Sequence, residues 1–291
     1  MKPCPAPAVR VRDGAAAAAD PAEAPPAGGR TDGCIPVVDA EDSSIRISLV
    51  IPVYNGAAFL DENLRRAATF LFLFDGPNEI VVVDDASTDG TDRLLERFAR
   101  RVKGIGFTVL RNEANRGKGY SVRRGMRAAR GRCRIFNDAD FTYPVEEVGH
   151  FALRLEEGAD VVIGSRLHPD SRYVIRPDFI PYLYTRHVMS RIFNLMVRFL
   201  LGLEIRDTQA GIKGFGRRAA ELVFSRQSLN RFSFDLEVLY IARLHGLAVE
   251  EVPVRFLYRK EPTTIRFFRD SVRMFLDMWR IRWRHLRGRY R

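Results

Sequence analysis

The sequence has no uninterrupted run of about 18 apolar residues, the length that a membrane-spanning helix requires. It has only three cysteines in 291 residues, and none stands in a metal-ligand spacing, so we expect no disulfide framework and no zinc site. The apolar stretch Ala15–Ala19 is too short for a signal peptide. These absences favour a cytoplasmic protein that is not inserted into a membrane.

Two nucleotide-binding motifs are also absent. No GxGxxG pattern follows the first expected strand, residues 47–53, which argues against an enzyme that uses a nicotinamide or flavin dinucleotide. The glycine-rich segment 115–119 lacks the length and the GK[ST] ending of a P-loop. Its glycines and Lys118 still favour a phosphate group, because they stand at the start of an expected helix.

Positive charge is concentrated near the C-terminus. The formal net charge is +11, and residues 265–291 carry nine arginines against two aspartates, which places +7 in this segment. The rest of the chain is only mildly basic, so we expect no nucleic-acid partner; an anionic lipid or a phosphorylated substrate fits better.

The same segment has apolar residues at helical spacing. They are Phe268, Val272, Phe275, Trp279, Trp283 and Leu286. An amphipathic helix with aromatic residues on one face and arginines on the others suits an anionic membrane surface. The alternative is a helix that packs on the preceding domain and has a frayed basic end.

Composition and hydrophobic pattern divide the chain into three regions. Residues 1–44 have almost no large apolar residues, so we expect them to be disordered. Residues 45–260 alternate strands and helices, which predicts an α/β domain with a twisted, mostly parallel sheet and helices on both faces. Residues 261–291 contain the amphipathic helix. The expected strands are 47–53, 80–83, 107–110, 133–136, 160–163 and 249–254, and the expected helices within the domain are 57–72, 87–101, 117–130, 144–156, 179–202, 217–224 and 235–244.

An acidic turn with Asp138 and Asp140 follows the expected strand 133–136. Two carboxylates around one small residue can share a divalent cation, and Mg²⁺ or Mn²⁺ prefers such oxygen ligands together with substrate phosphates. The alternative is a capping turn that binds nothing. Polar residues also follow the neighbouring strands, and ligands of parallel sheets collect at the carboxyl ends of strands. This placement favours the metal site.

Asp84 and Asp85 stand at the end of the expected strand 80–83. One carboxylate can accept hydrogen bonds from a nucleobase or ribose while the other orients the loop. The alternative is that the segment only caps the next helix, and the two roles are compatible.

Three more groups are candidates for substrate contact. Arg166 and the pair Arg186 and Ser190, spaced one helical turn apart, suit a phosphate clamp; the alternative is that the arginines are merely solvated. The polar loop 207–215 suits sugar hydroxyls, or is a surface turn. Asp235 and Glu237 begin the expected helix 235–244, where they either face the cleft or complement the helix dipole.

These segments resemble the family 2 glycosyltransferases of the GT-A fold, and more narrowly the dolichyl- or polyprenyl-phosphate sugar synthases. The resemblance spans residues 46–257, and NRGKGYSVRRGM and DTQAGIKGF look more like the dolichyl-phosphate glucosyltransferase branch than the mannosyl branch. The matching segments are 52–55, 83–91, 115–119, 124–126, 138–140, 164–166, 207–215 and 234–237.

The resemblance implies an inverting transfer of a hexose from a nucleotide sugar to a polyprenyl or dolichyl phosphate, with UDP-glucose favoured over GDP-mannose as the donor. It also implies that Asp138 and Asp140 hold Mg²⁺ or Mn²⁺. The residues expected to bind the nucleotide sugar are Pro52, Tyr54, Asn55, Asp84, Asp85, Lys118, Asp138 and Gln209. The expected catalytic residues are Asp140, Arg166, Arg186, Ser190 and Asp235.

Two positions depart from the family pattern. Relatives usually carry Glu after the asparagine of PVYN, where this chain has Gly56. Mannosyl relatives often carry Gln two residues beyond the second metal aspartate, where this chain has Thr142. The third metal ligand is therefore left open.

A lipid phosphate is already anionic near neutral pH, so it needs positioning and charge neutralisation rather than a strong base. We therefore do not expect Asp235 to be required as a base. A saccharide hydroxyl acceptor would require one, from Asp235 or Glu237. The remaining alternative is a non-catalytic nucleotide-binding protein. A lipid acceptor implies a peripheral protein at the cytoplasmic face of a membrane.

Overall fold

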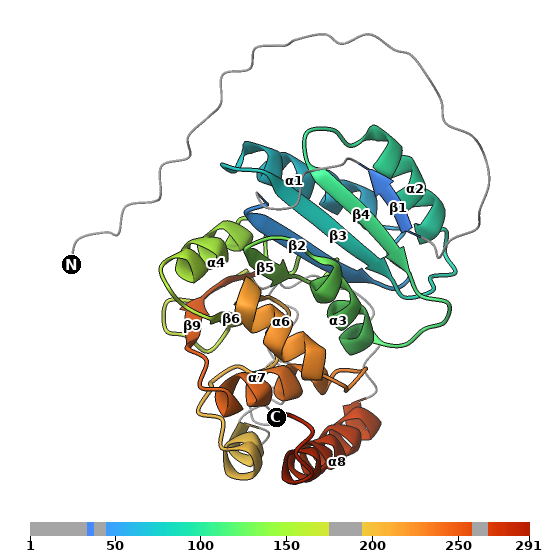
Figure 1. Ribbon diagram of the computed structural model, residues 1–291. Helices are drawn as coiled ribbons and strands as arrows, with labels where there is room; N and C mark the ends of the chain where they lie inside the picture. Colours follow the sequence, from blue (N-terminus) through green and yellow to red (C-terminus); the bar gives the residue numbers. More distant parts are fainter. Residues whose placement is uncertain (1–33, 38–44, 175–193, 258–266) are drawn as a thin grey trace.

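The computed structural model of the protein describes residues 34–37, 45–174, 194–257 and 267–291. Its centre is an eight-stranded sheet in the order β1-β4-β3-β2-β5-β8-β6-β9 (Figure 1). The strands are β1 (Cys34–Val37), β2 (Ile47–Val53), β3 (Asn78–Asp84), β4 (Gly106–Arg111), β5 (Cys133–Phe136), β6 (Val161–Ser165), β8 (Lys213–Gly216) and β9 (Val249–Pro253). A small second sheet pairs β7 (Arg172–Val174) with β10 (Arg255–Leu257).

The strands β4, β3, β2 and β5 run parallel, as the alternation of strands and helices predicts. Every residue of β2 and β3 is buried, because side chains on both faces of the sheet enter a core. In β2, Leu49 and Ile51 belong to one hydrophobic cluster and Val50 to the other. A strand that is covered on both faces has a continuous run of apolar residues, and this run is why the sequence predicted these strands.

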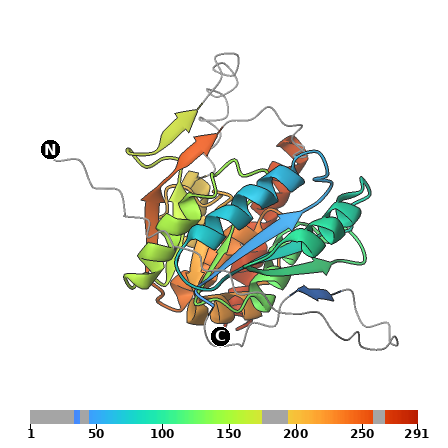
Figure 2. The same ribbon diagram turned by 90° about the horizontal axis from the view of Figure 1, so that it is seen from above.

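Helices cover both faces of the sheet. The first face carries α1 (Leu60–Leu73), α2 (Thr91–Arg101) and α4 (Glu147–Glu156), and Figure 2 shows α1 and α4 side by side over it. The second face carries α3 (Lys118–Ala128), α6 (Arg217–Arg226) and α7 (Phe234–Leu244). The spacing of Leu94, Leu95 and Phe98 in α2 puts all three on the buried side of that helix. The expected α/β architecture, with helices on both faces of the sheet, is confirmed.

The strand β8 is the main departure from prediction. We assigned residues 207–215 to a loop, but Lys213–Gly216 run antiparallel between β5 and β6. The four residues include two glycines and one lysine and no β-branched residue, so local propensity does not indicate a strand. A Cβ on Gly214 would lie 3.1 Å from Leu155, so close packing of α4 on the sheet accounts for a glycine here.

Two further differences concern segment boundaries. Cys34–Val37 form β1 beside β4, within the segment 1–44 for which we expected disorder; residues 1–33 and 38–44 lie outside the described part of the chain. The helix expected over 144–156 begins only at Glu147. Residues 194–201 are helical, while the earlier part of the expected helix 179–202 is not described.

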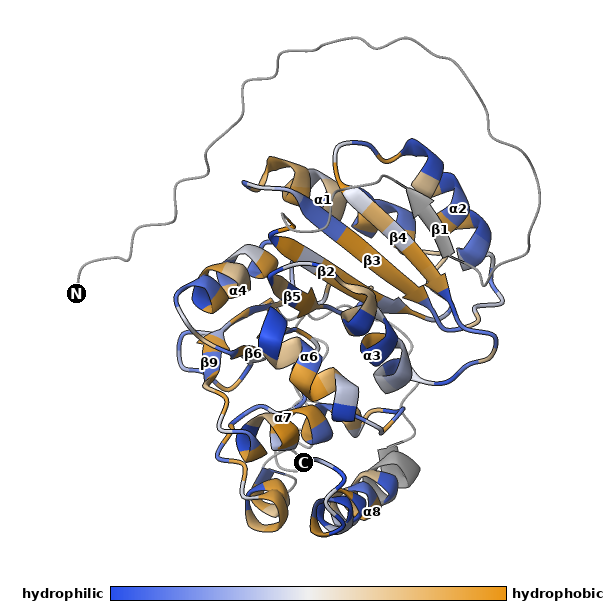
Figure 3. Ribbon diagram, viewed as in Figure 1, coloured by the Kyte–Doolittle hydropathy of each residue, from blue (hydrophilic) through white to orange (hydrophobic). Residues whose placement is uncertain are grey.

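The last helix, α8 (Phe267–Leu286), packs beside α7 at the end of the molecule (Figure 1). Met278 and Ile281 are fully buried, whereas Trp279 and Trp283 are about half exposed, at 54% and 53%. Figure 3 shows apolar and charged positions interspersed around this helix. The helix therefore packs on the domain and also presents aromatic residues to solvent. Among the described residues, no helix combines the length and the apolar character needed to span a bilayer.

Candidate active site

The acidic turn after β5 is held by hydrogen bonds from both sides. The amide of Thr142 donates to Asp140 Oδ1 at 2.9 Å, and Asn63 Nδ2 of α1 donates to the carbonyl oxygen of Ala139 at 2.8 Å. Asp138 and Asp140 both line one cavity. Burial and the neighbouring carboxylate of Asp138 raise the pKa of Asp140. The turn thus concentrates negative charge at a strand end, where a cation would be stabilised.

Lys118, the first residue of α3, is ion-paired with this turn. Its Nζ lies 2.5 Å from Asp138 Oδ1. Burial disfavours the charge of Lys118, but the carboxylates of Asp138, Asp235 and Asp140 outweigh it and raise the pKa of the lysine. A charged ammonium group therefore stands at the N-terminus of a helix and next to the acidic turn.

Asp85 orients the glycine-rich loop that precedes α3. Its carboxylate accepts hydrogen bonds from the amides of Arg116 at 2.8 Å and Gly117 at 2.7 Å, and from Asn112 Nδ2 at 2.7 Å. Gly117 has a φ of +94°, in the left-handed region that favours glycine. Of the two roles considered for the aspartate pair, the geometry gives Asp85 the orientation of the loop.

Asp84 and Asn55 tie neighbouring strand ends together. Asp84 is 1% exposed, and its Oδ1 accepts a hydrogen bond from the amide of Ser87 at 3.0 Å. Asn55 donates its amide to Ser87 Oγ at 2.8 Å and accepts from the amide of Thr88 at the same distance. Both residues therefore shape the loops after β2 and β3.

The loop before β8 closes over the acidic turn. A Cβ on Gly211 would lie only 2.1 Å from Asp138 Oδ2, so glycine alone lets the loop approach the carboxylate. In the same loop, Asp207 binds Arg166 in a two-pronged ion pair, with distances of 2.7 and 2.8 Å. The Arg166 guanidinium is thus already neutralised by a carboxylate. The exposed Gln209 points its Nε2 at Met274 Sδ of α8, 3.7 Å away.

Asp235 and Glu237 are buried and engaged. Lys213 Nζ lies 2.5 Å from Asp235 Oδ1, and burial lowers the pKa of this lysine and raises that of the aspartate. Glu237 accepts hydrogen bonds from Ser228 and from the hydroxyl of Tyr290, the latter at 2.7 Å. Both carboxylates therefore hold α7 in place rather than stand free in the cavity.

The cavity at the strand ends has a volume of about 400 Å³. Its lining brings together Pro52, Tyr54, Asp85, Lys118, Asp138 and Asp140 from the predicted set. Within the described part of the chain, this lining does not include Asn55, Asp84, Arg166, Gln209 or Asp235. Arg186 and Ser190 lie outside the described residues.

Several lining residues were not singled out from the sequence. They are Phe59, Ser121, Arg231, Ser233, Arg273 and Met274. Arg231 precedes the segment that resembles the family, which was a usable signal. Arg273 was hidden among nine arginines whose charge we assigned to a membrane surface.

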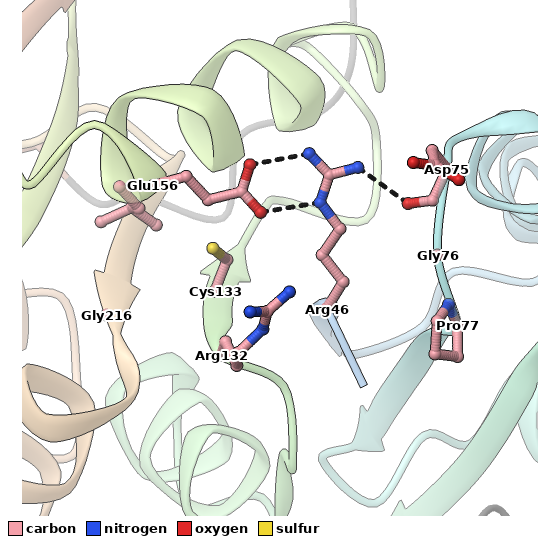
Figure 4. Close-up of a pocket in the computed structure, with 9 residues that line it drawn as sticks. Arg46, Asp75, Gly76, Pro77, Arg132, Cys133, Glu156 and Gly216 are labelled. Atoms are coloured by element: carbon pink, nitrogen blue, oxygen red, sulfur yellow. Dashed lines mark hydrogen bonds and ion pairs between the residues drawn. The ribbon is translucent and has the colours of Figure 1, made fainter. Parts of the chain in front are cut away.

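A larger hollow, of about 630 Å³, lies away from the carboxyl ends of β2 and β5 (Figure 4). Two of its charges are matched to each other, because Arg46 forms an ion pair with Glu156 at 2.7 Å, and Arg46 also donates to the carbonyl oxygen of Asp75. Burial raises the pKa of the Cys133 thiol to about 11, so this thiol stays protonated and unreactive. We therefore place the chemistry in the smaller cavity.

The acidic turn fits a divalent cation. Asp138 and Asp140 offer hard oxygen ligands, and burial together with the neighbouring Asp138 carboxylate raises the pKa of Asp140, an unfavourable environment for the charge that a bound cation would relieve. No group of three or more His, Cys, Asp or Glu side chains suited to a metal exists within the described residues. Two carboxylates are thus what the described chain supplies, and Mg²⁺ commonly completes its shell with water and substrate phosphates.

Carboxylates that face a lysine and a helix N-terminus at the ends of parallel strands suit the diphosphate of a nucleotide together with a divalent cation. The chain belongs to glycosyl transferase family 2, whose sequence model matches residues 48–224. This confirms the resemblance and the class of enzyme.

Named relatives narrow the similarity within the family. The dolichyl-phosphate beta-glucosyltransferase of Dictyostelium discoideum is 30% identical over 263 residues, covering 84% of this chain and 76% of the relative. The enzyme of the same name from Saccharomyces cerevisiae is 31% identical over 268 residues, covering 86% and 78%.

Solved structures with the same fold come from glucosyl-3-phosphoglycerate synthase of Mycobacterium tuberculosis. Its complex with Mn²⁺, UDP and glucosyl-3-phosphoglycerate has a TM-score of 0.54 at 20% identity, covering 84% of this chain and 80% of that one. Its complex with Mg²⁺ and UDP has a TM-score of 0.55. At this identity the likeness establishes the fold.

Proposed function

We propose that this chain transfers glucose from UDP-glucose to a dolichyl or polyprenyl phosphate, with inversion at the sugar carbon and with Mg²⁺ or Mn²⁺ as cofactor. The observation that carries the proposal is the pair Asp138 and Asp140, which faces the cavity beside Lys118. Two relatives, covered to 76% and 79% of their length, bear the name dolichyl-phosphate beta-glucosyltransferase and support the choice of sugar and acceptor.

The donor would bind between the ends of β2, β3 and β5. Pro52 and Tyr54 would contact the nucleoside, together with the loop that Asp85 orients. Lys118 and the amides that begin α3 would bind the diphosphate. Asp138 and Asp140 would hold the cation, which supplies charge neutralisation for the leaving nucleoside diphosphate.

The acceptor phosphate requires positive charge but no strong base. Its oxygen is already anionic near neutral pH, so the protein must orient it and offset its charge. We assign this to the group Arg166, Arg186 and Ser190, of which only Arg166 is described. Because Arg166 is bound to Asp207, it would act with that carboxylate as its orienting partner. The burial of Asp235 and Glu237 argues against a hydroxyl acceptor, which would need one of them as a free base.

The exposed face of α8 is suited to a peripheral position on an anionic membrane. Leu276, Trp279, Trp283 and Leu286 are each at least half exposed, Arg280 is exposed on the same helix, and the exposed Arg287 follows its last residue. Aromatic side chains with arginines around them bind at the interface of acidic lipids. Such a position would bring the cavity near a lipid-linked acceptor at the cytoplasmic face.

A panel of donors tests this function. The protein is incubated with UDP-glucose, UDP-galactose, GDP-mannose and other sugar nucleotides, a polyprenyl phosphate and Mg²⁺ or Mn²⁺, and the lipid phase is analysed by mass spectrometry. We expect a glucosylated lipid phosphate, formed most rapidly from UDP-glucose. A mannosylated product would correct the donor, and transfer to a free saccharide alone would refute the lipid acceptor.

A further inference from the structure

The C-terminal helix contributes to the wall of the cavity as well as to the molecular surface. Arg273 and Met274 of α8 line the same cavity as Asp138, Asp140 and Lys118. Met274 also contacts Gln209 in the loop that closes over the acidic turn. A segment that the sequence assigns to membrane contact therefore reaches the site where nucleotide sugar is expected.

The position of Arg273 is held by the turn of α8 that follows it. Asp277, one helical turn later and on the same side of the helix, accepts a hydrogen bond from the buried Ser233 Oγ at 2.7 Å. Met278 is fully buried in the core beside α7. Ser233 itself lines the cavity, so this bond joins α8 directly to the cavity wall.

The charges around Arg273 leave its guanidinium available. Lys118 is paired with Asp138, and the carboxylate of Asp85 is occupied by two backbone amides and Asn112. Arg273 is exposed, and within the described residues no ion pair or hydrogen bond engages its side chain. An unpaired arginine at the edge of a cavity favours an anion, and its planar fork fits two oxygens of one phosphate.

We propose that Arg273 binds a phosphate group in this cavity, so that α8 completes the substrate site. The identity of the phosphate rests on the proposed function: it is either the diphosphate of the nucleotide or the phosphate of the isoprenoid acceptor. Arg273 is a binding residue in this account. It ties occupancy of the cavity to the docking of α8 on the domain.

The test compares Arg273→Ala and Arg273→Lys with Arg282→Ala, which removes the same charge from an exposed position of the same helix. Titration calorimetry measures the Kd of UDP and GDP with Mg²⁺ in one arm, and of a short water-soluble isoprenyl phosphate in the other. We expect Arg273→Ala to weaken one of these ligands by about ten- to a hundredfold, the range of a charged hydrogen bond. Arg273→Lys should lose less affinity than Arg273→Ala, and Arg282→Ala should bind both ligands with the Kd values of the wild type.

The arm that responds identifies the phosphate. A higher Kd for the nucleoside diphosphates assigns Arg273 to the donor, and a higher Kd for the isoprenyl phosphate assigns it to the acceptor. The proposal is overturned if both Kd values of Arg273→Ala stay within twofold of those of Arg282→Ala. It is also overturned if Arg273→Lys loses as much affinity as Arg273→Ala and the Tm of both variants falls, since that pattern indicates a structural role. These titrations need no sugar transfer, so they stay interpretable even if the enzyme lacks the proposed activity.

Discussion

Lys118 Nζ lies 2.5 Å from Asp138 Oδ1, so the first residue of α3 neutralises one carboxylate of the acidic turn. The pairing joins two segments that the sequence identified for different reasons, a glycine-rich helix start and a strand end. If Asp138 and Asp140 held a divalent cation, the cation would neutralise Asp138, and Lys118 would then be free to bind the phosphates.

The acidic turn is expected to be essential for transfer. Asp138→Asn and Asp140→Asn each remove a negative oxygen ligand, so kcat/KM should fall at least about 100-fold, since metal stabilisation of the leaving group is worth several kcal/mol. Initial rates measured over a range of Mn²⁺ concentrations check this. Asp170→Asn, which alters a largely exposed aspartate, is the control. Wild-type rates in either turn variant would show that Asp138 and Asp140 do not form the metal site.

Gly211 is expected to leave the space that the Asp138 carboxylate needs in order to bind the metal. In Gly211→Ala the new Cβ would lie 2.1 Å from Asp138 Oδ2, so the carboxylate must move. We expect the apparent affinity for Mn²⁺ to fall about tenfold or more, as it does when the groups that orient metal ligands are altered. Gly216→Ala is the matched control, because its nearest neighbour would be the Asp160 carbonyl oxygen at 3.8 Å. Equal metal affinity in the two variants would contradict the contact.

Asp235 is expected to matter for stability before it matters for catalysis. Asp235→Asn leaves the fully buried Lys213 without its counter-charge, which should cost about 3 to 5 kcal/mol of unfolding free energy. Urea unfolding measures this, and the double variant Lys213→Met/Asp235→Leu should recover much of the loss. If Asp235→Asn keeps the stability of the wild type but its kcat falls at unchanged KM, Asp235 acts as a base. The acceptor would then be a hydroxyl group and not a phosphate.

The exposed aromatic residues of α8 are expected to mediate membrane binding. Trp279→Ala/Trp283→Ala removes two half-exposed side chains and leaves the buried Met278 and Ile281 in place. Flotation with vesicles that contain acidic lipids should fall about tenfold, consistent with the loss of about 1.5 kcal/mol of apolar burial. Phe72→Ala, at an exposed position of α1, is the control. Equal flotation of all three proteins would exclude this face of α8 as the docking surface.

The predictable part of the fold is the part that depends on the local pattern of apolar and polar residues. β2, β3 and β5 are buried on both faces, so each reads as an apolar run, and the polar residues that follow each run mark the cavity edge. The acidic turn could be located because it directly follows β5. The antiparallel β8 could not, because its glycines and its lysine are explained only by neighbours far away in the sequence.

The ion-pair partners of Arg166 and Asp235 could not be predicted from the local sequence pattern either. Nothing near Arg166 in the sequence indicates that Asp207 binds it, and nothing near Asp235 indicates Lys213. Arg166 and Asp235 were singled out as candidates for substrate contact, but their partners depend on how the loop before β8 folds back on the sheet. The contribution of Arg273 was hidden for the same reason, because only the docking of α8 brings it to the cavity.

The most direct test of the central claim is sugar transfer itself. Wild type and Asp140→Asn are each incubated with UDP-glucose labelled in the sugar and with dolichyl phosphate, with Mg²⁺ and again after chelation of the metal. We predict that labelled glucosyl phosphoryl dolichol forms only with the wild-type enzyme and metal together. Product of equal yield after chelation, or in Asp140→Asn, or no lipid-linked sugar from any sugar nucleotide, would contradict the account.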